Sequence, residues 1–126
     1  MPVATVGDFD NTRHELKTAP PDGYVVIRRL SYGESLRREA LSTNFTVDGN
    51  SNAKDFVGNV KIDQEAVAQF DFEHCIVEHN LTDKNEKLLN FKNPADLAKL
   101  DRRVGKEIGD LIDDMNNFEE DEEVKN

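Results

Sequence analysis

The sequence predicts an α+β fold: a small N-terminal antiparallel β part with one short helix, a C-terminal part of about three helices, and a disordered acidic tail. Three observations predict this class. A Pro-Pro-Asp-Gly turn precedes a run of β-branched and aromatic residues. Helix-capping patterns precede several later segments. Apolar residues recur at helical spacing near the C-terminus.

The length of 126 residues provides for one domain, which we place at residues 1–118. We expect residues 12–62 to be mainly β and residues 63–118 to be mainly helical. The net charge of −10 argues against binding nucleic acid or anionic membranes through bulk electrostatics. The longest apolar run, residues 24–27, is far shorter than the roughly 20 residues of a membrane span, and no signal peptide is visible. A single cysteine, Cys75, is typical of a cytosolic protein.

The first expected elements form a hairpin. Its turn is residues 20–23, because proline presets φ and Gly23 accepts a positive φ. The strand after the turn spans residues 24–30, and residues 12–17 are expected to form the other arm.

A helix should follow the hairpin. Ser31 and Glu34 form a capping box, which predicts a helix to about residue 41. The side chains expected to face inward are Leu36, Ala40 and Leu41. Alternating apolar residues then predict short strands at residues 45–47 and 56–62.

The remaining residues up to 118 are expected to be mainly helical. Asp63 should cap a helix whose apolar residues continue to Val77 and lie on more than one side, which is typical of a central core helix. A polar break follows at residues 81–87.

Two more helix starts follow this break. Asn93 should cap a helix with Pro94 in its first turn and with Leu97 and Leu100 as its buried pair. Asp101 should cap the last helix, which has the clearest amphipathic stripe in the chain. That stripe consists of Val104, Ile108, Leu111, Ile112, Met115 and Phe118.

Negative charge is concentrated at the C-terminal end. Residues 113–126 carry seven acidic residues against one lysine, which is six of the ten net negative charges. Such a block repels itself and buries too little apolar surface to offset the entropy of ordering. We therefore predict that residues 119–126 are a disordered acidic tail.

Residues 74–79, HCIVEH, are the best candidate for a chemical site. On a helix, Cys75 and His79 would share a face and could bind zinc. His74 and His79 are five apart, which places them roughly 140° apart around a helix and prevents easy ligation of one ion. We favour a buried cysteine beside two partly exposed histidines, and we predict no catalytic residue, no metal site and no cofactor.

Three further patterns have a structural interpretation. Residues 83–87 begin like a calcium loop but lack its central glycine and its terminal glutamate, which favours a solvated turn. Gly105 and Gly109 have helix-packing spacing within a charged helix. Paired arginines at 28–29, 37–38 and 102–103 are expected to form salt bridges rather than to read nucleic acid.

Five stretches of structural residues carry a resemblance to a known family. They read RRLSYGE at 28–34, FDFEHCIVEHNL at 70–81, LNFKNPAD at 89–96, LDRRVGKEI at 100–108 and LIDDMNNF at 111–118. Together they resemble the tail assembly chaperones of long-tailed, siphovirus-type bacteriophages and prophages. The resemblance covers about residues 24–120.

The resemblance implies a non-enzymatic protein that binds the tape-measure protein and keeps it soluble while the tail tube assembles. It further implies the host bacterial cytoplasm as the location and absence from the mature virion. The tail-tube protein and a longer, frameshifted form of the chain itself are additional partners that it suggests.

A holding protein needs an apolar groove and a repulsive surface, and the net charge of −10 supplies the repulsion. We expect the groove on the last two helices, at residues shared between core and partner. These are Leu97, Leu100, Ile108, Leu111, Ile112 and Met115.

Three other functions compete with the chaperone. A structural virion protein, such as a tail or head–tail joining component, would self-assemble and be present in purified particles. A metal enzyme built on Cys75 and His79 would hold stoichiometric zinc. An acidic mimic of DNA would carry an ordered array of carboxylates, whereas six of the ten net negative charges here lie in residues 113–126, at the end of the chain.

Overall fold

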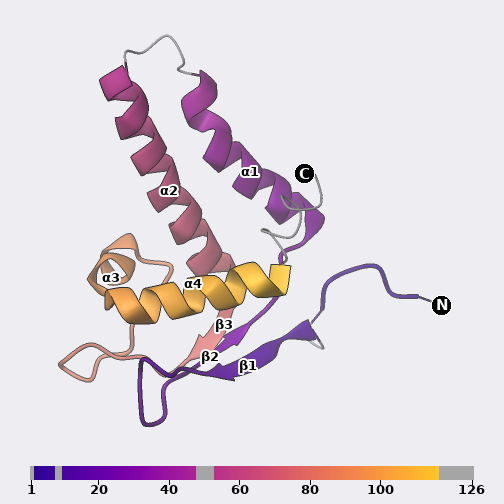
Figure 1. Ribbon diagram of the computed structural model, residues 1–126. Helices are drawn as coiled ribbons and strands as arrows, with labels where there is room; N and C mark the ends of the chain where they lie inside the picture. The colour runs from indigo at the N-terminus through magenta and orange to yellow at the C-terminus, as the bar shows by residue number, and fades with distance from the viewer. Residues whose placement is uncertain (1, 8–9, 48–52, 117–126) are drawn as a thin grey trace.

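The computed structural model describes residues 2–7, 10–47 and 53–116, apart from the side chains of residues 43–63. It has an α+β fold, as predicted, in which a three-stranded antiparallel sheet packs against helices (Figure 1). The strands are β1 (Thr12–Glu15), β2 (Tyr24–Ile27) and β3 (Ile76–His79), in the order β1-β2-β3. The helices are α1 (Tyr32–Val47), α2 (Ala53–Cys75), α3 (Pro94–Lys99) and α4 (Arg102–Asn116).

The predicted hairpin is formed by β1 and β2, which pair in the register Thr12 to Ile27. Its turn depends on Gly23 for a reason that differs from the predicted one. Gly23 does not adopt a positive φ. A Cβ atom at this position would instead collide with the carbonyl oxygen of Ala19, to which the Gly23 N–H donates at 2.9 Å. Close approach of two backbone segments, rather than backbone handedness, therefore requires glycine.

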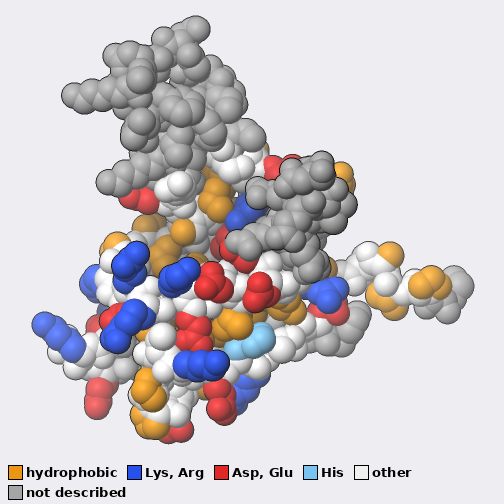
Figure 2. Space-filling view, viewed as in Figure 1, with side chains coloured by type: hydrophobic (Ala, Val, Ile, Leu, Met, Phe, Trp, Pro, Cys, Tyr) orange, Lys and Arg blue, Asp and Glu red, His pale blue; other side chains and the backbone are white. Residues whose placement is uncertain are grey.

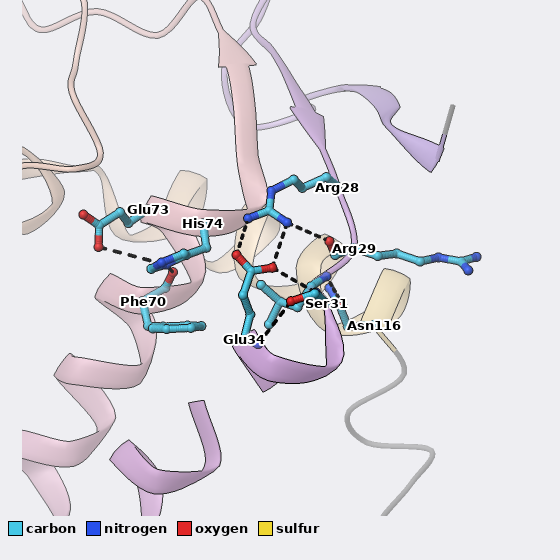
Figure 3. Close-up of polar contacts among 9 residues, drawn as sticks. Arg28, Arg29, Ser31, Glu34, Phe70, Glu73, His74 and Asn116 are labelled. Atoms are coloured by element: carbon cyan, nitrogen blue, oxygen red, sulfur yellow. Dashed lines mark hydrogen bonds and ion pairs between the residues drawn. The ribbon is translucent and has the colours of Figure 1, made fainter. Parts of the chain in front are cut away.

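The predicted capping box at the start of α1 is confirmed. The Ser31 N–H donates to Glu34 Oε1 at 2.9 Å, and the Glu34 N–H donates to Ser31 Oγ at 3.2 Å. Arg28 then donates from both terminal nitrogens to the same carboxylate, at 2.9 and 2.7 Å (Figure 3). Hydrogen bonds from Arg28 and Ser31 outweigh the effect of burial and lower the pKa of Glu34 to about 2. The carboxylate therefore fixes both the helix start and the strand before it.

The strands expected at residues 45–47 and 56–62 are not formed. The first range lies in α1 and the second in α2, and α2 begins at Ala53 rather than at a cap on Asp63. Short apolar runs fit either period, and residues 56, 57 and 60 also share one helical face. Helix α1 consequently extends past residue 41, and Leu36, expected to face inward, is 47% exposed.

The segment expected to continue helical to Val77 instead changes structure after Cys75. Residues Ile76–His79 form β3, which pairs with β2. The register of this pairing shifts between Val26 and Ile27. The Arg28 N–H donates to the Cys75 carbonyl at 2.9 Å, which joins the end of α2 to the sheet. Pairing with a strand about 50 residues earlier in the sequence, which no local pattern reveals, overrides the helical period.

Both remaining helix caps are confirmed. Asn93 Oδ1 accepts the Ala95 N–H at 3.0 Å, with Pro94 as the first residue of α3. Asp101 Oδ1 accepts the Arg103 N–H at 2.8 Å at the start of α4. Phe118 and the predicted tail at residues 119–126 lie outside the described residues.

One cluster of buried side chains combines residues of the hairpin, of helices α2 and α4, and of the loop between β3 and α3. Helices α1 and α2 form an antiparallel pair that rises from the sheet, and α4 lies across the base of this pair (Figure 1). The cluster comprises Leu16, Val25, Ile27, Leu30, Phe70, Phe72, Cys75, Leu81, Leu89, Phe91, Val104, Ile108 and Ile112.

Candidate functional site

The segment at residues 74–79 does not form the arrangement that would bind zinc. Cys75 ends α2 and is fully buried, whereas His79 lies in β3. Burial, together with the charge of Asp71, raises the pKa of the Cys75 thiol to about 12, which keeps the sulfur protonated and unreactive. His79 Nδ1 accepts the Leu81 N–H at 3.0 Å, so this ring nitrogen stabilises the loop that follows β3. Among the residues that the structure describes, no three His, Cys, Asp or Glu side chains are grouped to hold a metal ion.

His74 also has a structural role. Its ring stacks on Phe70 with the centroids 4.0 Å apart, and its Nδ1 lies 2.9 Å from the Phe70 carbonyl oxygen (Figure 3). Glu73 Oε2 lies 4.0 Å from the same nitrogen. These contacts hold the imidazole against its own helix.

In the turn at residues 83–87, the carboxylate of Asp83 accepts hydrogen bonds from the backbone. Asp83 Oδ1 accepts the N–H groups of Asn85 and Lys87 at 2.8 and 3.1 Å. These two hydrogen bonds lower the pKa of Asp83. Asp83 therefore closes a tight turn, as the sequence predicted.

The six residues predicted to bind a partner do not form one surface. Ile108 and Ile112 are completely buried in the core, so no groove exposes them. The helical stripe was identified correctly, but its centre faces the sheet and α2. The other four, Leu97, Leu100, Leu111 and Met115, are half-buried and pack against the edge of the core.

Leu100 alone of these six lines a groove at one corner of the described structure. We call it the corner groove. It is an open depression of about 890 Å³ between the hairpin turn, the loop after β3 and the corner between α3 and α4. Its apolar lining consists of Ala19, Pro20, Pro21, Leu81, Leu89, Leu100 and Val104.

Asn80 sets the spacing between two walls of the corner groove. Its Oδ1 accepts the Tyr24 N–H at 2.9 Å, and its Nδ2 donates to the Asp22 carbonyl at 2.8 Å. The third wall is tied to the same hairpin through Glu107 on α4. Its carboxylate accepts the Lys17 N–H, the Thr18 N–H and the Thr18 hydroxyl at 2.9, 3.0 and 2.6 Å. The groove is therefore a fixed feature of the fold.

Positive charge is concentrated in the segment that forms two walls of the corner groove, whereas the charged lining itself comprises Lys84 and Lys99 with Asp22, Asp83 and Asp101. Residues 81–106 contain seven Lys or Arg and four Asp or Glu, a net charge of +3. The rest of the chain contains nine basic and 22 acidic residues, a net charge of −13. We call five of these cations the basic corner, and they are Lys84, Lys99, Arg102, Arg103 and Lys106.

The first turn of α4 holds basic residues, although the helix macrodipole disfavours positive charge at an N-terminus. Arg102 and Arg103 occupy the first turn, where no acidic residue lies, and the last turn holds no basic residue. Figure 2 shows Lys and Arg at the left end of α4 and acidic side chains further along it. Exposed cations at a helix N-terminus cost about 0.3–1 kcal/mol each, which the Asp101 cap offsets only in part. A local rule that is broken without benefit to folding is typical of a functional surface.

A second, smaller groove of about 400 Å³ lies between β3 and the loop before α3. It contains two of the exposed large apolar side chains, Val77 and Leu88, at 52% and 56% exposure. Sequence reasoning missed both grooves, because each combines segments that are distant along the chain. The charge asymmetry between residues 81–106 and the remainder was the signal that could have indicated the first.

No helix in the described ranges is both long and apolar enough to cross a lipid bilayer. Comparisons of the chain with models of protein families, with curated proteins and with solved structures gave no match.

Proposed function

We propose that the protein is a non-enzymatic tail assembly chaperone that binds a bacteriophage tape-measure protein and keeps it soluble during tail-tube assembly. The corner groove is the observation that carries this proposal. It presents an apolar floor, including Leu100, on the surface of a strongly acidic protein. The stretches of sequence that resemble this family, at 89–96 and 100–108, contribute Leu89, Leu100, Asp101 and Val104 to the groove.

The chemistry of the groove suits this task. A tape-measure protein is long and helical, and its apolar faces aggregate before the tube covers them. An apolar groove takes one face of an amphipathic helix, while the net charge of −10 keeps such complexes apart in solution. Binding requires no turnover, so the protein acts in proportion to its amount. We place it in the host bacterial cytoplasm and outside the mature virion.

Co-expression with the tape-measure protein tests the proposal. The readout is the fraction of tape-measure protein that stays soluble and co-purifies with this chain. Asn85→Trp fills the groove from an exposed residue of its wall and should abolish the effect. Leu36→Asp is the matched control, because Leu36 is an exposed apolar residue on α1, outside the groove.

Soluble tape-measure protein with the natural chain and with Leu36→Asp, but not with Asn85→Trp, supports the proposal. Circular dichroism must show that all three chains are folded. If the tape-measure protein is equally insoluble with and without the natural chain, the chaperone function is wrong. Detection of the chain as a stoichiometric component of purified particles would favour the alternative, a structural virion protein.

A further inference from the structure

Three cations of the basic corner, Lys99, Arg103 and Lys106, pair only with acidic residues two to four positions away in the sequence. Lys99 Nζ lies 3.6 Å from Asp96, and Lys106 Nζ lies 3.7 Å from Asp110, one turn away on the same helix in each case. The side chains of Lys99, Lys106 and Arg103 are 64, 73 and 79% exposed. Exposed pairs of this kind contribute little to stability. These cations therefore remain accessible to a partner.

The acidic residues at the groove have the opposite character. Asp83 accepts two backbone N–H groups of its own turn, and Asp101 accepts the Arg103 N–H as the cap of α4. Two of the three carboxylates that line the groove are thus held by backbone groups, and the third belongs to Asp22. The long cationic side chains of Lys84 and Lys99, which also line the groove, extend from exposed positions.

We propose that the corner groove selects an acidic amphipathic segment of its protein partner. The apolar side chains of that segment would pack on Leu81, Leu100 and Val104, and its carboxylates would pair with the basic corner. The inference rests on the proposed function in one respect, that the groove holds a protein segment. It adds the sign of the charge that the segment carries.

Charge complementarity determines this choice of partner. A net charge of +3 on residues 81–106 attracts an acidic segment locally, whereas the net charge of −10 on the whole chain repels it at long range. A basic segment would be attracted by the acidic remainder of the molecule. At the groove it would meet Lys84 and Lys99, beside Asp22 and the two carboxylates that backbone N–H groups already bind. Nucleic acid fits less well, because its phosphates would leave the apolar floor uncovered and would meet the same long-range repulsion.

Fluorescence anisotropy with the purified full-length chain tests the inference. The probes are two labelled helical peptides of about 14 residues with the same leucine face, one with glutamate and one with lysine on its polar face. We expect the acidic peptide to bind at least about tenfold more tightly, and to weaken as NaCl rises from about 50 to about 500 mM. A single-stranded oligonucleotide is the third probe.

Variants locate the binding surface. Reversing both Arg102 and Arg103 to Glu should weaken the acidic peptide by at least about tenfold, because attraction becomes repulsion. Arg37→Glu is the matched control, since Arg37 is an exposed arginine on α1. Asn85→Trp, which fills the groove, should weaken binding independently of charge. Circular dichroism confirms that each variant is folded.

The possible outcomes separate this inference from the proposed function. Tighter binding of the lysine peptide, equal loss with Arg37→Glu, or stronger binding of the oligonucleotide would each overturn the inference. Absence of peptide binding while the tape-measure protein still co-purifies would overturn the inference alone. If neither peptide binds and the tape-measure protein stays insoluble, both proposals are wrong.

Discussion

The two halves of α4 use their charged and polar residues in opposite ways. In the C-terminal half, Asn116 accepts the Leu30 N–H at 2.9 Å, and Asp113 lies 4.0 Å from Arg38 on α1. In the N-terminal half, Arg102, Arg103 and Lys106 form no hydrogen bond or ion pair with another element among the described residues. The C-terminal half therefore uses these polar groups within the fold, whereas the basic residues of the N-terminal half present their charge to solvent. The difference shows which charges a partner can use.

Arg38 on α1 lies near the C-terminal half of α4, and its substitution should have the largest effect on stability. Its Nε and Nη2 donate to Asp71 at 2.7 and 3.0 Å, and Asp71 is only 7% exposed. We expect Arg38→Ala to lower the free energy of unfolding by about 3 kcal/mol, because it leaves a buried carboxylate without its partner. Urea denaturation measures the change. A loss below about 0.5 kcal/mol, the size expected for an ordinary surface substitution, would contradict the structural role.

Glu34, at the start of α1, should make the stability of the fold depend on pH. Its pKa is about 2 in the folded protein, below its value of 4.5 in the unfolded chain, so its stabilising effect is full above about pH 4.5. That stability is lost as the pH falls toward 2 and the carboxylate becomes protonated. We expect a contribution of about 2–3 kcal/mol, measured by thermal unfolding between about pH 6 and pH 2.5.

The control for this prediction is Glu34→Gln, which should be less stable at neutral pH and should lack this part of the acid dependence. Other carboxylates, such as Asp83 and Asp101, also have lowered pKa values and contribute in both chains. The difference between the two curves therefore isolates Glu34. Parallel curves would show that Arg28 and Ser31 do not hold its charge.

Glu107 is an acidic residue of the N-terminal half that does contact the rest of the fold, and its substitution should have an intermediate effect. Its carboxylate accepts three hydrogen bonds from Lys17 and Thr18, which tie the hairpin to α4. We expect Glu107→Ala to lower the free energy of unfolding by about 1–2 kcal/mol, because two backbone N–H groups lose a charged acceptor but remain near solvent. Faster hydrogen exchange at Lys17 and Thr18, with the β2–β3 amides unchanged, would show that the loss is local.

Local signals allowed much of this fold to be predicted, and long-range contacts explain the rest. The Ser31–Glu34 capping box and the Asn93 and Asp101 caps depend on residues two or three positions away, so the sequence reveals them directly. Strand β3 exists because it pairs with β2, and the sequence near residue 76 favours helix equally well. The corner groove was not predicted because its walls come from three separate segments.

Arg102→Glu sharpens the comparison most, although its effect on stability is the smallest. An acidic residue in the first turn of α4 interacts favourably with the helix macrodipole, and Arg102 forms no hydrogen bond or ion pair with the described residues that would be lost. We expect the free energy of unfolding to rise by about 0.5 kcal/mol, measured by urea denaturation at low salt, with the gain reduced at high salt. Asp113→Lys, the matched reversal in the other half, should instead destabilise the protein, because it places a cation near Arg38. If Arg102→Glu stabilises the chain and weakens the acidic peptide, the arginine is retained for binding at a cost to stability. A loss of stability would mean that the basic corner also supports the fold, and the two halves of α4 would then differ only in degree.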